Sequence, residues 1–252
     1  MIERSEKEGE LLRGILSIPE IGMRVPWFRE RLHRQTIERS CHEMDGIVRR
    51  AHLGEAEARE ALLTVSFALV QERDDNVVRA VRLFAQSHTL WDLERLVRDG
   101  PEVAQEFEGD DRVPSYSSDR EQSFGERRRL ARRAPRAVLE KIVLDPHPLV
   151  LQQLFESSRL VEADVVRIAA RRPLRPAAIE ILTSSVNWLR RTRVRLTLVL
   201  NPGCPHGVAM PLVSTFPSED LQLLVTSTTI SLTLRTAAHE LLERLPPYPD
   251  RD

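Results

Sequence analysis

The chain lacks the marks of secreted and membrane proteins. It has two cysteines in 252 residues, Cys41 and Cys204, which excludes a disulfide framework. Its N-terminus is charged and carries no apolar stretch typical of a signal peptide. No apolar run reaches the roughly 18 residues that a membrane span needs. We therefore expect a soluble cytoplasmic protein with no membrane contact.

The chain is also poor in the residues that build sheets and catalytic loops. Aromatic residues make up 5% of it, and it has only 10 glycines, so an all-β fold is not favoured. No nucleophile elbow, phosphate-binding loop or dinucleotide-binding glycine pattern is present. Cys204 and His206 are too few ligands for a structural zinc. We expect no enzyme activity, no cofactor and no metal.

Lysine is nearly absent, and the charges that remain are unevenly placed. Of the 37 basic residues, 35 are arginine, a bias typical of GC-rich genomes. Residues 99–126 carry 9 acidic and 2 basic residues, whereas residues 127–200 carry 6 acidic and 16 basic ones. The formal net charge of −1 therefore conceals an acidic segment followed by a basic one.

Apolar residues recur at the helical spacing almost throughout the chain. The pattern predicts one long helix over 26–52 that begins at Pro26, and another over 54–72. Residues 99–126 break the pattern with Gly, Pro, Ser and acidic residues, which indicates a linker. We predict three parts: an N-terminal helical lobe (1–98), an acidic linker (99–126) and a helical-repeat lobe (127–252).

Prolines punctuate the second half at intervals that suit helices of about ten residues, too short to be stable alone. The segment that starts at Pro148 matches the one that starts at Pro176, an offset of 28 residues. The same offset relates Val166-Arg167-Ile168 to Val194-Arg195-Leu196. Repeated short helix pairs must stack to bury their apolar faces, so we expect an all-α fold of the α-solenoid type.

Two motifs carry a resemblance to known repeats. Residues 74–79, Asp-Asp-Asn-Val-Val-Arg, resemble the opening of the second helix of a HEAT repeat. Residues 201–208, Asn-Pro-Gly-Cys-Pro-His-Gly-Val, are similar to the junction of leucine-rich-repeat-variant proteins, with Cys204 in place of the usual threonine. The resemblance to these bacterial helical-repeat families covers about 130–245 and, more loosely, 54–98. It implies an interaction scaffold and, because the cysteine cluster of some members is absent, no iron–sulfur centre.

Arginines cluster at helix starts and turns of the predicted repeats. Because repeats stack in register, we expect the clusters at 171–175 and 190–195, the second of which includes Arg195, to lie near each other along one edge. Arginines in a row bind carboxylates or phosphates, and a nucleic-acid base stacks well on an indole. The candidate partner-binding residues are Arg132, Arg133, Arg136, Arg171, Arg172, Arg175, Trp188, Arg190, Arg191 and Arg193.

Three interpretations of function follow. The first is a non-catalytic scaffold or adaptor that binds a protein partner through the groove of its stacked helices. The alternative is a HEAT-like protein that binds nucleic acid through the arginine-rich surface of 127–195. A third, an enzyme similar to HEAT-like DNA glycosylases, requires aromatic residues and a carboxylate that the basic segment supplies sparsely. The plain interpretation of the arginines is a solvated face in an arginine-rich chain. The sequence does not predict the oligomeric state.

Overall fold

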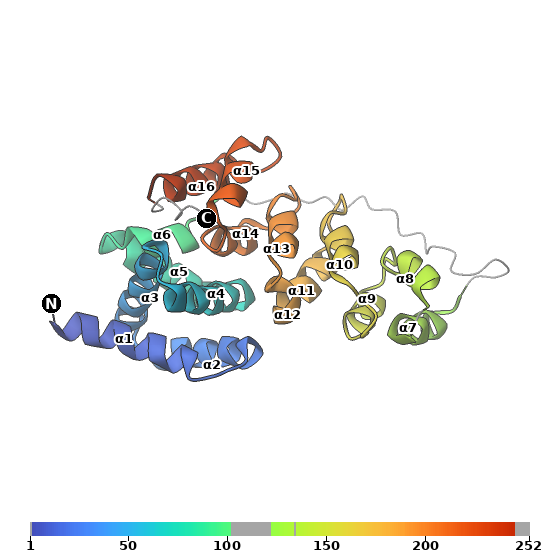
Figure 1. Ribbon diagram of the computed structural model, residues 1–252, viewed down its shortest axis with the longest axis horizontal. Coiled ribbons are helices and arrows are strands. Elements are labelled where there is room, and N and C mark those ends of the chain that lie inside the picture. Colours follow the sequence, from blue (N-terminus) through green and yellow to red (C-terminus); the bar gives the residue numbers. More distant parts are fainter. Residues whose placement is uncertain (1, 102–121, 134, 245–252) are drawn as a thin grey trace, which may run out of the picture. The chain divides into compact units, whose positions relative to one another are not determined.

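The computed structural model describes residues 2–101, 122–133 and 135–244, with side chains from residue 9 onward (Figure 1). These residues form sixteen helices and no strand, which confirms the all-α prediction. None of the described helices has the length and apolar character required to cross a membrane. Most of the predicted acidic linker, residues 102–121, lies outside the described residues.

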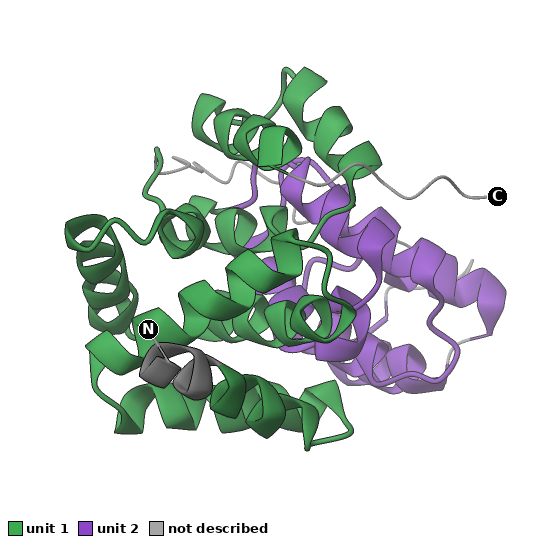
Figure 2. Ribbon diagram, turned by 60° about the vertical axis from the view of Figure 1, so that its left-hand side comes forward, with its two compact units in different colours: residues 1–102, 205–252 green, residues 103–204 purple. Residues whose placement is uncertain are grey.

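The chain divides into two compact units, coloured separately in Figure 2. Unit 1 combines residues 1–102 with 205–252, and unit 2 comprises residues 103–204. The helices of unit 1 are α1 (Ile2–Leu16), α2 (Ile21–Arg34), α3 (Ile37–His52), α4 (Ala56–Gln71), α5 (Asp75–Ser87), α6 (Trp91–Val97), α14 (His206–Val213), α15 (Ser218–Thr226) and α16 (Leu232–Arg244).

Helix α4 lies at the centre of unit 1, because α1, α2, α3 and α14 all pack against it. Its residues from Thr64 to Val70 are all buried, as expected for a helix that is apolar on every side. Helix α14 packs on α4, α6 and α16, so this C-terminal segment shares the core of the N-terminal helices. The predicted 127–252 lobe differs from this arrangement, since residues 205–244 belong to unit 1.

The helix predicted over 26–52 is wrong, because the structure has two helices there. Helix α2 begins at Ile21 and holds Pro26 in its interior, and α3 begins after Thr36. The Thr36 hydroxyl accepts a hydrogen bond from the amide of Arg39 (3.4 Å), which caps the new helix. Pro26 is the sixth residue of α2, past the first turn, so it removes one backbone hydrogen bond from the interior of the helix.

The described residues of unit 2 form seven short helices: α7 (Phe124–Arg133), α8 (Arg136–Ile142), α9 (Pro148–Phe155), α10 (Glu162–Ala169), α11 (Pro176–Ser184), α12 (Val186–Leu189) and α13 (Thr192–Val199). Within it, α9 packs against both α7 and α11, and α10 packs against α13. Figure 1 shows α7, α9 and α11 following one another in one row, with α8, α10 and α13 in a second.

The predicted helix starts are confirmed at two positions. Both α9 and α11 begin with a proline, Pro148 and Pro176, in their first turn. The junction after α13 is held by Asn201, which is 3% exposed. Its amide nitrogen donates to the carbonyls of Ala169 (2.8 Å) and Arg171 (2.7 Å), and its oxygen accepts from the amide of Gly203 (2.9 Å). One buried side chain therefore joins the end of α13 to the end of α10.

Candidate functional site

All ten predicted partner-binding residues belong to unit 2, but they do not form one group. Helices α10 and α13 run parallel, as the contacts at their two ends show. At their starts, Arg191 lies 3.9 Å from the Glu162 carboxylate. At their other ends, Asn201 contacts Ala169 and Arg171.

This geometry corrects the prediction that the clusters at 171–175 and 190–195 share an edge. The first cluster follows the end of α10, whereas the second surrounds the start of α13. An eight-residue helix is about 12 Å long, so the two clusters lie at opposite ends of the helix row. The 28-residue offset places residue 190 opposite residue 162, and not opposite residue 171.

Arginines lie on three successive turns of unit 2, which form one edge. The first turn joins α7 to α8, the second joins α9 to α10, and the third, which includes α12, joins α11 to α13. Arg159 donates from Nη1 to the carbonyl of Arg133 (3.4 Å), which joins the first turn to the second. Arg191 and Glu162 join the second turn to the third. We call this row the basic edge; its members, all exposed, are Arg132, Arg133, Arg136, Arg159, Arg190, Arg191 and Arg193.

Carboxylates already occupy two positions on the basic edge. Arg136 binds Asp164 through both terminal nitrogens, at 2.6 Å and 2.7 Å. Burial would raise the pKa of Asp164, but its bonds with Arg136 and with the amide of Val161 outweigh burial and lower it. Because Asp164 is wholly buried, it neutralises part of the Arg136 charge from beneath and leaves the rest of the row facing solvent.

Three other residues of the basic segment have structural roles. Arg195 is 4% exposed and donates to the carbonyls of Leu189 (2.7 Å) and Arg190 (2.9 Å), which fixes the turn before α13. Arg127 forms a buried ion pair with Asp145 (2.8 Å). Trp188 is half-buried in α12, and its carbonyl accepts from the amide of Arg191 (3.0 Å). The backbone of Trp188 therefore helps to fix the turn that carries Arg190 and Arg191, and its side chain is partly covered.

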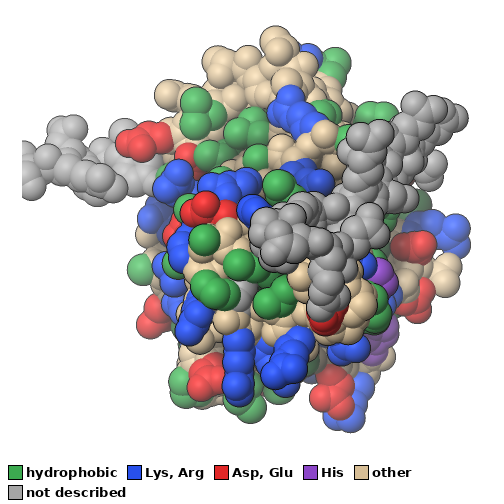
Figure 3. Space-filling view, turned by 90° about the vertical axis from the view of Figure 1, so that its right-hand side faces the viewer, with side chains coloured by type: hydrophobic (Ala, Val, Ile, Leu, Met, Phe, Trp, Pro, Cys, Tyr) green, Lys and Arg blue, Asp and Glu red, His purple; other side chains and the backbone are tan. Residues whose placement is uncertain are grey.

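Figure 3 views the molecule from the side on which α7 and α8 lie. Lys and Arg side chains are spread over this face among hydrophobic ones, with fewer acidic side chains between them. The exposed arginines of α7 are Arg128, Arg129, Arg132 and Arg133. The basic character of the segment is therefore a surface property, although Arg127 and Arg195 are buried.

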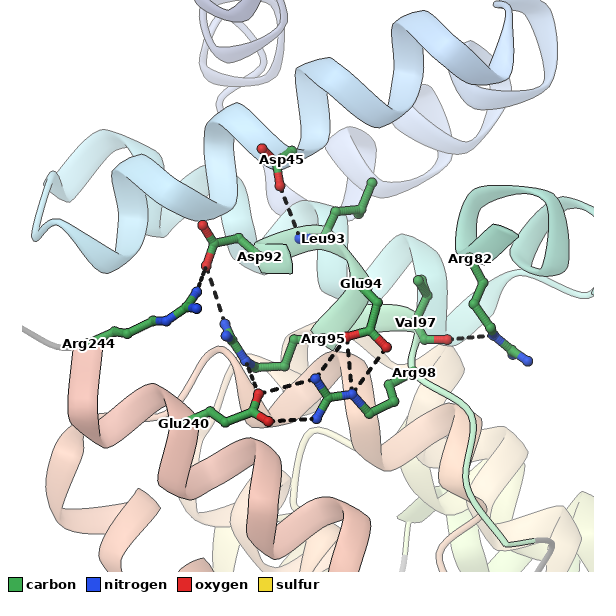
Figure 4. Close-up of polar contacts among 10 residues, drawn as sticks. All are labelled: Asp45, Arg82, Asp92, Leu93, Glu94, Arg95, Val97, Arg98, Glu240 and Arg244. Carbon is green, nitrogen blue, oxygen red and sulfur yellow. Dashed lines mark hydrogen bonds and ion pairs between the residues drawn. The ribbon is translucent and has the colours of Figure 1, made fainter. Parts of the chain in front are cut away.

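A second charged cluster, which sequence analysis did not identify, lies in unit 1 between α6 and α16 (Figure 4). Arg95 is 2% exposed and pairs with Glu240 (3.0 Å) and Asp92 (3.3 Å). Arg98 bonds to Glu94 (2.8 Å) and to Glu240 (3.1 Å). Its members pair with one another, so the cluster holds α16 on α6.

The start of α6 is fixed by residues that are distant in the sequence. The carboxylate of Asp45, on α3, accepts a hydrogen bond from the amide of Leu93 (3.2 Å), so it caps α6 from a neighbouring helix. His52 Nδ1 lies 3.7 Å from Asp92. Burial would raise the pKa of Asp92, but its interactions with His52 and Arg95 outweigh burial and lower it to about 2.

The two cysteines lie in apolar surroundings. Both are buried, and burial raises the pKa of Cys41 to about 12 and that of Cys204 further above its ordinary value. Thiols of this kind are unreactive at neutral pH. Among the described residues, no group of three His, Cys, Asp or Glu side chains is arranged to hold a metal ion.

The arrangement in unit 2 supports binding of an anionic surface more directly than it supports chemistry. The basic edge offers guanidinium groups and carboxylates that already pair with Arg136 and Arg191. Comparison of the chain with protein-family models, with curated proteins and with solved structures finds no match.

Proposed function

We propose that the protein is a non-catalytic cytoplasmic adaptor whose unit 2 is a short α-solenoid that binds an acidic protein partner along the basic edge. The observation that carries the proposal is the row of seven exposed arginines on three consecutive turns of stacked helices. Packed helices are separated by 8–10 Å, so each turn presents its guanidinium groups about that distance from the next.

The chemistry of the row favours carboxylates as its ligands. Arg136 and Arg191 already bind carboxylates, and a guanidinium pairs with a carboxylate through two parallel hydrogen bonds. Arginine also loses less hydration than lysine when a partner covers it. A partner that presents Asp and Glu side chains along an extended segment or a helix face would complement this edge.

Nucleic acid is the second candidate, since a row of arginines also binds phosphates. Proteins that bind single strands combine such a row with several aromatic side chains on which bases stack. The seven members of the basic edge include no aromatic residue, and Trp188, next to Arg190 in the chain, is half-buried. This composition supports the protein partner over a nucleic acid.

The test compares charge removal at the basic edge with the same removal elsewhere. A variant with Arg132, Arg190 and Arg193 replaced by glutamine should lose partners captured from the native host. The control replaces Arg13, Arg49 and Arg79, which are exposed on unit 1, and should retain them. Equal capture by both variants would refute binding at the basic edge.

A duplex of random sequence separates the two candidates. For the protein-binding adaptor, the duplex should bind no more tightly than any polyanion does to exposed arginines, and a folded acidic protein should compete with it. Tight duplex binding that falls steeply with salt and resists acidic competitors would instead favour the nucleic-acid function.

A further inference from the structure

The three turns of the basic edge differ in the side chains that they present to solvent. The first and third turns contribute three arginines each, namely Arg132, Arg133 and Arg136, and Arg190, Arg191 and Arg193. The middle turn contributes only Arg159, and close to it in the chain lies Val161, whose side chain is 46% exposed. The row is therefore strongly basic at both ends and has an exposed apolar side chain at its centre.

Val161 is held in place by contacts with the turns on either side. Its amide donates to the Asp164 carboxylate (3.2 Å), and Arg136 of the first turn binds the same carboxylate. The next residue, Glu162, lies 3.9 Å from Arg191 of the third turn. The backbone around the valine is therefore fixed before a partner arrives, which lowers the entropic cost of binding.

An exposed apolar residue enclosed by arginines has the composition of a protein interface. Interfaces have an apolar centre, a polar rim that excludes water from it, and more arginine than the rest of the surface. A partner that is acidic throughout would place carboxylates against Val161, where they would lose water without gaining a hydrogen bond. The best partner therefore presents an apolar side chain opposite Val161 and carboxylates on both sides of it.

The spacing of the turns favours a helix as the form of this partner. Neighbouring turns are separated by about 8–10 Å, the distance between packed helices. In an α-helix, side chains seven residues apart share one face and lie about 10.5 Å apart along the axis. In an extended segment, side chains on one face recur at about 6.6 Å or about 13 Å. The helical spacing is the closer match.

We propose that the partner of the basic edge is an amphipathic helix with an acidic–apolar–acidic face, whose three groups recur every seven residues. Its central apolar side chain packs on Val161. Its carboxylates pair with the arginines of the first turn at one end and with those of the third turn at the other. This inference rests on the adaptor function proposed above and specifies the class of partner that the adaptor binds.

The test measures the binding of labelled synthetic peptides to the full chain by fluorescence anisotropy at physiological salt. The first peptide, of about 20 residues, has a central pair of leucines and a pair of glutamates seven residues to each side, in an alanine and glutamine background. The second has glutamates in place of the leucines, and the third has a proline on each side of them. The first should bind about tenfold more tightly than either of the others, because it alone places an apolar group on Val161.

A matched pair of variants isolates the apolar contact. V161S should weaken binding of the leucine peptide about tenfold and leave that of the all-acidic peptide unchanged. Serine is favourable at the N-cap of a helix, the position that Val161 holds in α10, so this variant should fold. The control is L149S, because Leu149 is 44% exposed but lies at the start of α9, away from the basic edge. It should bind as the native chain does.

The outcomes separate this inference from the adaptor function. Equal binding of the leucine and all-acidic peptides, or an unchanged affinity of V161S for the leucine peptide, would overturn the apolar contact. Equal binding of the proline peptide would overturn the helix. In these cases the adaptor function stands if the triple glutamine variant of Arg132, Arg190 and Arg193 still loses its captured partners. If that variant keeps both its partners and the leucine peptide, the adaptor function itself is refuted.

Discussion

At the scale of single residues, the sequence does not distinguish arginines that bind partners from arginines that hold the fold. Arg95, Arg127 and Arg195 are buried, and Arg132, Arg190 and Arg193 are exposed, although all are the same residue in similar helical patterns. The difference depends on contacts such as that of Arg95 with Glu240, 145 positions away. Composition could predict that a basic surface exists, but the identity of its members required the packed structure.

Asp92 should contribute to stability in a pH-dependent way. His52 and Arg95 outweigh burial and lower its pKa from 3.8 to about 2, so the folded state binds this proton less readily than the unfolded chain. Its contribution is present above the unfolded pKa and is lost as the pH falls toward 2. D92N should cost about 2 kcal/mol at pH 7 by urea unfolding, and the difference should shrink as the pH falls below 4.

The control for D92N is Asp75, an exposed residue in the first turn of α5. D75N should change the free energy of unfolding little at either pH. A cost for D92N that stays constant between pH 7 and pH 2.5 would contradict the ionic origin of the effect.

Asn201 should be one of the most sensitive polar residues of unit 2. N201A removes the donor to the carbonyls of Ala169 and Arg171 and the acceptor of the Gly203 amide. An unsatisfied buried group costs about 1–3 kcal/mol, so the loss should be about 2 kcal/mol or more by chemical denaturation. Asn187, which is exposed in α12, provides the matched control, and N187A should be nearly neutral. Similar losses in both variants would argue against the junction role.

At the scale of helices, the sequence predicted where repeats begin better than how their ends are arranged. Pro148 and Pro176 fix helix starts through local geometry, which a sequence pattern captures. The same rule gave a wrong helix start at Pro26, because α2 begins five residues before it. The 28-residue offset pairs residue 190 with residue 162, at the start of α10, whereas residues 171–175 follow the end of that helix. The separation of the two clusters could therefore be predicted from the sequence once the start and end of each helix are compared.

The junction between α6 and α14 requires a glycine. A Cβ atom at Gly100 would overlap the imidazole ring of His206, which is 8% exposed and has little room to move. G100A should lower the stability of unit 1 by about 1–3 kcal/mol. In an H206A background, where the ring is absent, the same substitution should cost far less. The measurement is a double-mutant cycle by urea unfolding.

Gly125 in α7 supplies the comparison for G100A. Nothing lies within 4 Å of a Cβ atom built there, so G125A should leave stability unchanged or slightly raise it. Additive effects of G100A and H206A would show that the two residues do not share the contact that the structure gives them.

At the scale of the whole molecule, the main departure from the sequence prediction concerns which segments fold together. Residues 205–244 continue the short-helix pattern of 127–200, so a linear interpretation assigns them to the same lobe. In the structure they pack with α4 and α6, and Glu240 pairs with Arg95 and Arg98 across the core of unit 1. Local periodicity contains no information about such long-range pairing, which is why the division of the chain could not be predicted.

Hydrogen exchange measured with and without E240Q tests this division directly. The substitution removes Glu240 from Arg95, a buried cation, and leaves Asp92 as its charged partner among the described residues, so unit 1 should be destabilised by about 2 kcal/mol or more. Exchange should then accelerate together in α4, α6 and α14, none of which contains the substituted residue, while α9–α13 keep their protection. Glu243, which is exposed and pairs with the neighbouring His239, is the control, and E243Q should change none of these rates. If α14 instead kept the exchange rates of α13 while α4 and α6 accelerated, residues 205–244 would belong with the repeats, and the 127–252 lobe expected from the sequence would be the correct unit.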